Sequence, residues 1–561
     1  MNDRKLLLAL ALIMVIAFLP TYLLKRNQPP PKPAPVSVTA DGMAPVPVVV
    51  PQGAAAAPAG AGTSQPLGPE DTVVVRSSLY RYGISTRGGR IISSQFLQYV
   101  TLVDSGKRGT LELLPAADGL LGGLLVSDKD TLHLDQVVFS ASADSLDVTK
   151  GPATLTLRGQ SGPYAIDMIY TFSPTDYRIN SSGKIRGLGP VGGTLLVSLG
   201  NGFRQTEASA QDNAISSGIV TKQEKTNVTL FSKLKPRIVT PISGPFEWVA
   251  VKSKYFVAGF FAYDSSGQGI KGNIGGVQAF VADTQSTVTR AQVVASLAVP
   301  SEGSFHWSMY LGPMEYDRLS HMGRDFDDVN PYGWAWLRPV IRPIAVVIRT
   351  IFVWMHSALG LGYGLVIVMF GLMVRILTWP LNRIALRSMA RMQTVQPLIT
   401  ALQDRYKDNP QQLQAETFKL YKEHNVNPFG GCWPMLLPYP LLVAVFFVLA
   451  YTIEVRGQTF LWLPDLARAD PLYIIPVLMA GSMFVVSKIG QMGLPPNPQT
   501  KMMTWLMPVI MLVFFGRFAS GLNLYYTIQN LASIPQQWLV VKERMKAKPL
   551  TPAVIVKKRP S

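Results

Sequence analysis

The chain has 561 residues, of which 48% are hydrophobic and only 15% are charged, a balance typical of a membrane protein with soluble parts. Its single cysteine, Cys432, excludes an intramolecular disulfide, and its scattered histidines lack the spacing of metal ligands, so we expect no metal site. The net charge of +18 suits cytosolic loops, an anionic lipid surface or nucleic acid, and the positions of the charges must decide between these.

The first two segments are predicted to be a membrane anchor and a tether. Residues 1–26 contain the apolar run Leu6–Leu24 between basic residues, and the run ends without a small-residue cleavage site. This pattern predicts an uncleaved transmembrane anchor. Residues 27–71 hold 11 prolines and few charges, so they cannot bury a core and are expected to form a disordered tether.

Residues 72–325 are predicted to form one large β-rich domain. Clusters such as Val73-Val74-Val75 and Tyr170-Thr171-Phe172 alternate with turn formers such as Arg87-Gly88-Gly89. About 250 residues is long enough for a β-sandwich with a real core. The segment lacks a Gly-x-Ser-x-Gly motif, so we expect a binding or scaffolding domain with no catalytic residue rather than an enzyme.

Residues 332–358 have the pattern of an amphipathic helix. Arg338, Arg342 and Arg349 fall on one side at 100° per residue, and aliphatic side chains fill much of the rest. The pattern favours a helix lying in the membrane interface. The alternative is a helix whose polar face packs on the β-domain.

The run Gly360–Ile384 is long enough to cross a bilayer and carries Arg375 well inside it. A buried arginine in a span costs at least about 2.5–3.5 kcal/mol, so it normally has a partner. No Asp, Glu or His occurs in the later apolar runs, 430–452, 472–487, 502–518 and 522–541. Arg375 therefore either snorkels to the cytosolic surface or faces a water-filled cavity that awaits a negative charge from elsewhere.

Residues 382–428 contain no apolar run long enough to cross. Arg383, Arg387 and Arg391 recur every four residues, and Asp408-Asn409-Pro410 is a helix break followed by a helix start. The pattern predicts an antiparallel helical hairpin of two amphipathic halves. It either receives a partner or is a solvated loop without one.

The last span, 522–541, carries a polar stripe. Its members lie within about 120° of one another and are Asn523, Tyr526, Thr527, Asn530, Ser533 and Gln537. Such a stripe must face other helices or water. It therefore either forms hydrogen bonds between helices or, together with Arg375, lines a shared hydrophilic groove.

Charge predicts the orientation of the chain. The hairpin, the 488–501 link and the tail 542–561 are basic and therefore cytosolic, whereas the 453–471 link is poor in Lys and Arg and lies outside. With six spans, both termini are cytosolic and the β-domain is outside, which in a bacterium is the periplasm.

Several short motifs together carry a family resemblance, and they follow one another in the family's order over most of residues 72–540. They are Ile84-Ser85-Thr86-Arg87-Gly88-Gly89, Tyr255-Phe256-Val257-Ala258, Tyr310-Leu311-Gly312-Pro313, Val374-Arg375 with Trp379-Pro380-Leu381, Ser388-Met389-Ala390, Val426-Asn427-Pro428-Phe429-Gly430-Gly431-Cys432, and Ser520-Gly521-Leu522 with Leu524-Tyr525-Tyr526. The chain resembles the YidC/Oxa/Alb family of membrane-protein insertases, in its Gram-negative form with a large periplasmic domain.

The resemblance implies a polytopic α-helical inner-membrane protein with a five-helix core in 360–541 and a periplasmic β-supersandwich. The core would hold a groove open to the cytosol and lipid but closed outside. Arg375 aligns with the family's groove arginine and Tyr526 with a tyrosine that contacts substrate. The chain departs from the family at Gly371, often Thr, and at Pro438, often Gln.

We therefore expect an insertase and chaperone for nascent membrane proteins that works in the lipid bilayer without a cofactor. The expected partners are a ribosome that contacts the cytosolic loops and tail, and a Sec translocon. The expected substrate-binding residues are Arg375, Asn523, Tyr526, Thr527 and Asn530. A secondary transporter or channel is the alternative function, and a transporter would need an inverted repeat and coupling carboxylates, which the spans lack.

Overall fold

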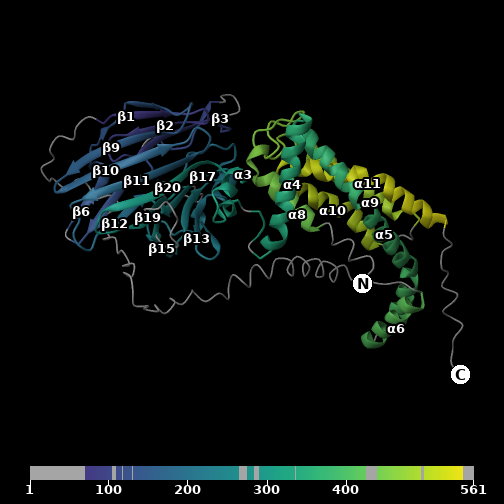
Figure 1. Ribbon diagram of the computed structural model, residues 1–561. Helices are drawn as coiled ribbons and strands as arrows, with labels where there is room; N and C mark the ends of the chain where they lie inside the picture. The colour runs from purple at the N-terminus through teal and green to yellow at the C-terminus, as the bar shows by residue number, and fades with distance from the viewer. Residues whose placement is uncertain are drawn as a thin grey trace, which may run out of the picture. The chain divides into compact units, whose positions relative to one another are not determined.

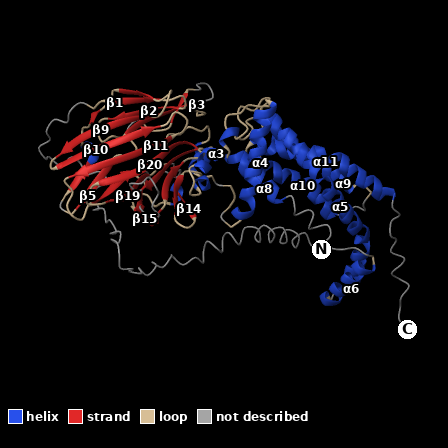
Figure 2. Ribbon diagram, viewed as in Figure 1, coloured by secondary structure: helices blue, strands red, loops and turns tan. Residues whose placement is uncertain are grey.

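The computed structural model of the chain describes residues 70–103, 109–115, 118–128, 130–263, 274–282, 290–330, 332–334, 336–407, 409–424, 439–493 and 498–546. The predicted anchor, the tether up to residue 69, the tail from residue 547 and Pro438 lie outside these residues. Strands occupy the first half of the described chain and long helices the second (Figures 1 and 2).

Within the described residues the β-domain consists of three sheets, which confirms the expected large β-sheet domain. A five-stranded sheet has the order β4 (Thr110–Glu112), β3 (Ile91–Val100), β2 (Tyr80–Ser85), β1 (Thr72–Arg76), β8 (Ser145–Asp147). A nine-stranded sheet has the order β14 (Thr226–Leu230), β13 (Gly218–Lys222), β16 (Trp248–Lys252), β17 (Phe256–Tyr263), β20 (Ser304–Pro313), β11 (Arg178–Arg186), β10 (Tyr164–Phe172), β9 (Ala153–Ser161), β7 (Ser140–Ala141). A six-stranded sheet has the order β15 (Thr240–Phe246), β18 (Ile274–Phe280), β19 (Gln292–Val299), β12 (Gly193–Ser198), β5 (Gly123–Ser127), β6 (Thr131–His133).

The period of the side chains explains how these sheets are buried. In β10 every second residue is buried, as expected for a strand with one face on the core. β16 and β17 are instead buried at almost every position. On one face of β17, Phe256 stacks on Phe96 of β3 with ring centroids 5.6 Å apart. On the other face, Phe261 meets Phe326 at 4.8 Å, so the centre of the nine-stranded sheet is covered on both sides.

The 3-10 helix η3 (Phe326–Val329) joins the β-domain to the first long helix, α4 (Arg338–Leu359). Phe326 packs so closely on Gly259 that a Cβ there would lie 2.3 Å from the ring, which is why the strand carries glycine at that position. The next two residues of η3, Asp327 and Asp328, form ion pairs with Arg342 of α4. One short segment thus binds both the sheet and the helix.

Arg349 of α4 is also paired, and only 4% of it is exposed. It binds Asp317 of α3 (Tyr316–His321) at 2.8 Å, and Glu454 of η4 (Ile453–Val455). Arg342 and Arg349 therefore bind carboxylates, of which Asp317 lies in the predicted β-domain and Glu454 in the connection after α8 (Tyr439–Tyr451). By length and composition α4 could also cross a membrane, so its position at the interface remains a prediction.

A second junction is built around Arg456, just after η4. Both Oε atoms of Glu207 lie 3.0 Å from its Nε, and its other nitrogens donate to the carbonyls of Val100 and Thr206. The guanidinium also lies over the ring of Tyr255, 5.8 Å from the centroid. Because an unpaired buried charge is costly, this set of partners holds the connection between α8 and α9 (Ile474–Gln491) against the β-domain.

The remaining helices are α2 (Ala210–Ala214), α5 (Tyr363–Arg405), α6 (Pro410–Glu423), α8 (Tyr439–Tyr451), α9 (Ile474–Gln491), α10 (Pro498–Phe515) and α11 (Ser520–Lys546). Three described helical segments are long and apolar enough to cross a membrane: α4, residues 363–380 of α5, and α9. α8 and residues 501–515 of α10 are shorter apolar helices. The number of spans and their orientation stay predictions.

α5 and α6 form the hairpin predicted for residues 382–428. α5 continues without a break from the apolar run through Arg405 (Figure 1), and α6 begins at Pro410 with the side chain of Asn409 accepting from the backbone N–H of Gln412. The predicted helix start is therefore confirmed. A small apolar cluster that includes Leu398 and Leu420 holds the two halves together.

Lys252, at the end of β16, is a buried cation whose titration can be tested. It is 3% exposed, and its Nζ donates to the carbonyl of Val329 at 3.2 Å. Burial, with a smaller effect from Arg338, lowers the pKa of Lys252 from 10.5 to about 8. Between these two values the unfolded chain binds more protons than the native one, so this group makes the protein more stable as pH rises from about 8 towards 10.5.

We predict that Lys252→Met raises the free energy of unfolding by about 2 kcal/mol at pH 7, because it removes a buried charge at the expense of one hydrogen bond. The gain should shrink towards zero by about pH 10 as the wild-type lysine loses its proton. Thermal unfolding of the full chain in detergent across this pH range measures the difference. A variant less stable than wild type at pH 7 would show that the bond to Val329 outweighs desolvation.

Candidate functional site

Arg375 lies half-buried in the interface between α5 and α11. Its Nη2 donates to Oε1 of Gln536 at 2.5 Å, and its Nε is buried without a hydrogen-bond partner among the described residues. No acidic side chain among the described residues forms an ion pair with Arg375. Arginine keeps its proton in proteins, so the described helices leave this charge without a counter-charge.

Gln536 is itself held on both sides. It is 1% exposed, and its Nε2 donates to the carbonyl of Trp379 at 2.8 Å while its Oε1 faces Arg375. One turn of α5 beyond Trp379, Arg383 forms a more exposed ion pair with Glu543 of α11 at 3.1 Å. The two helices are therefore joined by polar contacts at successive levels.

A third contact between the same helices lies at Gly371. Gln529 of α11 donates through Nε2 to the carbonyl of Gly371 at 2.8 Å. A Cβ at Gly371 would meet a methyl group of Ile528 at 3.1 Å, so the glycine lets the backbones approach closely.

Two residues of the predicted polar stripe on α11, Asn523 and Asn530, bind other helices rather than Arg375. Asn523 is fully buried and donates to the carbonyl of Phe515 at 3.0 Å. Asn530 donates to Ser482 of α9 at 3.1 Å. Thr527 donates to the carbonyl of Asn523 within its own helix at 2.7 Å. The bonds of Asn523 and Asn530 are interhelical, as in one of the two alternatives that the sequence left open, whereas the bond of Thr527 is internal to α11.

Tyr526 differs from its neighbours in the stripe. It is half-buried, and its ring meets those of Phe515 and Tyr525 with centroids 5.1 and 6.0 Å away. No hydrogen bond of its hydroxyl is recorded among the described residues. Three of the five predicted substrate-binding residues therefore retain a polar group without a recorded partner among the described residues: Arg375 at Nε, Asn523 at Oδ1 and Tyr526 at its hydroxyl. Of these, Asn523 is fully buried, whereas Arg375 and Tyr526 are half-buried.

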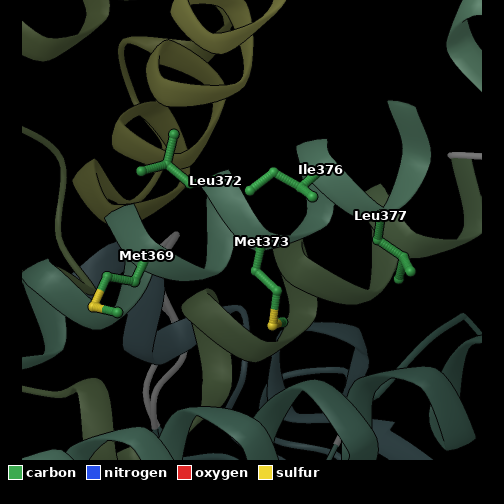
Figure 3. Close-up of a pocket in the computed structure, with 5 residues that line it drawn as sticks. All are labelled: Met369, Leu372, Met373, Ile376 and Leu377. Carbon is green, nitrogen blue, oxygen red and sulfur yellow. The ribbon is translucent and has the colours of Figure 1, made fainter. Parts of the chain in front are cut away.

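A second face of α5, directed away from its polar contacts with α11, is apolar and lines a pocket of about 430 Å³ (Figure 3). Five side chains from successive turns line it: Met369, Leu372, Met373, Ile376 and Leu377. All five are exposed by 41–74% in the isolated chain. In a bilayer, acyl chains cover such a surface, so α5 presents a polar face to α11 and an apolar face away from it.

Gln529 and Gln536 lie outside the polar stripe predicted from the sequence. Seven residues separate them, so they point in nearly the same direction, about 100° away from the centre of the predicted stripe at 100° per residue. This seven-residue spacing is the signal in the sequence that indicates a second polar face on α11. Among the described residues, no group of three or more His, Cys, Asp or Glu side chains could hold a metal ion.

Comparison with known proteins covers both halves of the chain. A family described as "60Kd inner membrane protein" matches residues 354–548, and one described as "YidC periplasmic domain" matches residues 72–346. The chain is 31% identical over 508 residues to the membrane protein insertase YidC of Chlorobium luteolum, covering 84% of this chain and 83% of that protein. It is 32% identical over 501 residues to that of Chlorobaculum tepidum, covering 84% and 82%.

Among solved structures, a crystal structure of active YidC insertase with its first transmembrane domain resolved is similar over 84% of this chain and 95% of that one. Its sequence identity is 16% and its TM-score 0.34, so the sequence matches carry the comparison.

The hydrogen bond from Asn530 to Ser482 gives a prediction about packing. Asn530→Ala should lower the thermal midpoint of the protein in detergent, because it removes a bond between α9 and α11 worth about 1 kcal/mol. Leu531→Ala is the matched control, since Leu531 is 48% exposed on the same helix. The dependence of insertion on the charge of the substrate should stay as in wild type. A loss confined to acidic substrates would instead make Asn530 a substrate contact.

Proposed function

The chain belongs to the YidC/Oxa1 family and is a membrane-protein insertase of the inner membrane with a periplasmic domain, and we propose that it moves polar segments of nascent membrane proteins past Arg375 by charge attraction. The observation that carries this proposal is a half-buried arginine whose recorded partner is a neutral amide. Such a cation is available to a carboxylate that arrives with the substrate.

The chemistry of the guanidinium supports a transient ion pair. Arginine has five N–H donors, of which the contact with Gln536 uses one, and a carboxylate can accept two of the others in parallel. A nascent chain with an acidic N-terminal tail would first bind here and then be released as its apolar span enters lipid. Burial of that span supplies about 25 cal/mol per Å², and the membrane potential acts on the acid in addition.

We propose that Arg375 and Tyr526 make the polar contacts with the substrate. The hydrogen bonds of Asn523, Thr527 and Asn530 inside the helical bundle favour a packing role for those three side chains. No covalent step is required, because the reaction is a transfer between water and lipid.

The distribution of charge is the basis for proposing which segments lie in the cytosol. The hairpin of α5 and α6 and the tail 542–561 are rich in Lys and Arg, which is typical of cytosolic segments. We propose that they receive the nascent chain and contact the ribosome, and that both termini are cytosolic. A Sec translocon is also a proposed partner, and we assign it no particular binding surface.

We predict that insertion depends on both the charge at position 375 and the charge of the substrate tail. Arg375→Ala should reduce insertion of a single-span substrate with two acidic tail residues about tenfold, the effect of losing about 1.5 kcal/mol of charged hydrogen bonding. A neutral tail should insert as in wild type. Arg375→Lys should retain insertion, and Arg375→Glu should be worse than Ala for the acidic tail.

Protease protection of tails with zero, one or two acidic residues, compared across these variants, measures the effect. The competing explanation is that Arg375 only keeps the interface hydrated, in which case any strongly polar side chain would serve. Insertion of the two-acid substrate by Arg375→Glu at the wild-type level would establish that explanation and reject attraction.

A further prediction concerns the β-domain, for which we propose a role outside the insertion step. Deleting residues 72–300 should leave insertion largely intact, because the carboxylates that bind Arg342 and Arg349 all follow residue 300. Arg456 would lose Glu207 but would then face water. In the shortened chain, Arg349→Ala should impair insertion by leaving Glu454 unpaired. Loss of insertion by a deletion variant that accumulates normally in the membrane would contradict the prediction.

A further inference from the structure

The amide of Gln536 has one orientation that satisfies both of its neighbours. Its oxygen accepts from Arg375 at 2.5 Å, and its nitrogen donates to the carbonyl of Trp379 at 2.8 Å. A flipped amide would place N–H against N–H and oxygen against oxygen. Since the side chain is 1% exposed, water cannot readily replace either partner. The position of one guanidinium nitrogen is therefore set by α5 and α11 together.

The partner of Arg375 differs in charge from those of the other buried arginines described above. Arg349 and Arg456, 4% and 8% exposed, both bind carboxylates, at Glu454 and Glu207 respectively. A carboxylate at position 536 would form the same kind of pair with Arg375, and an arriving acid would have to displace it. A neutral amide holds the guanidinium without neutralising it.

We propose that Gln536 is a positioning residue for Arg375 and a determinant of specificity, which keeps the arginine in place with its charge free for acidic segments of the substrate. The proposal rests on the role of Arg375 given under the proposed function. It assigns to this interface a preference for carboxylate-bearing tails that depends on the absence of a charge at position 536.

Gln536→Glu tests the proposal directly, because it changes charge with almost no change in size. Insertion of the two-acid substrate should fall to the level of Arg375→Ala, while insertion of the neutral substrate should stay as in wild type. If Gln536 had a merely structural role, insertion of the neutral substrate would fall as well.

Gln529→Glu is the matched control. Gln529 lies two turns away on α11, about 10 Å along the helix, and makes the same kind of bond to the carbonyl of Gly371 on α5. The substitution removes that bond and adds the same charge to the same interface without touching Arg375. Its dependence on tail charge should match that of wild type.

Gln536→Met separates position from charge. It removes both hydrogen bonds and leaves Arg375 charged, so insertion of the acidic substrate should fall, but less than in Gln536→Glu. If Gln536→Glu does not accumulate in the membrane, this variant decides the question. Wild-type insertion of the acidic substrate by Gln536→Met would then show that the amide does not position the arginine, and would overturn the proposal.

Measuring Arg375→Ala in parallel separates the two hypotheses. If that variant loses acidic substrates selectively while Gln536→Glu behaves as wild type, the role of Gln536 is wrong and the role of Arg375 stands. If neither variant distinguishes acidic from neutral tails, attraction by Arg375 fails and the inference fails with it. An equal loss of both substrates in Gln536→Glu, with Gln529→Glu unaffected, would indicate packing and would also overturn the proposal.

Discussion

Burial of cations is the constraint on which this structure depends. A guanidinium removed from water must find hydrogen-bond acceptors, and usually a counter-charge, or its burial costs several kcal/mol. Arg349 and Arg456 find both in carboxylates brought by other segments. In the described parts of the chain, Arg375 finds only the oxygen of Gln536. The first arrangement produces fixed junctions. The second leaves one cation with unused hydrogen-bond donors, which is the basis of the recognition role proposed for Arg375.

The two fixed junctions are adjacent in sequence. Glu454 and Arg456 lie two residues apart in the connection between α8 and α9, and one binds α4 while the other binds the β-domain. Ile453 belongs to the buried core of the β-domain itself. A connection that would otherwise be a simple external loop is therefore part of two packed units, and the end of α8 is tied to both.

Much of the fold could be predicted from the sequence, because it depends on local pattern. The β-branched clusters became strands, the apolar runs became helices wherever the structure describes them, and Asn409-Pro410 marked the start of α6. The partners of the charges could not be predicted in the same way. Glu454 is 105 residues from Arg349, and the helical period gives the direction of a side chain on its own helix but not the identity of the neighbouring helix. For that reason the stripe on α11 was found while its contacts with α9 were not, and Gln536 was missed.

The continuity of α5 has a mechanical consequence. Thirty residues separate Arg375 from the end of the helix at Arg405, a distance of about 45 Å along the axis at 1.5 Å per residue. A sideways force at the far end of an unbroken helix of that length exerts a torque on the part that holds Arg375. The contacts of α5 with α11, from Gly371 to Arg383, are the points at which this helix is held. Because α5 is continuous, a load on the hairpin would act along this helix on the contacts around Arg375.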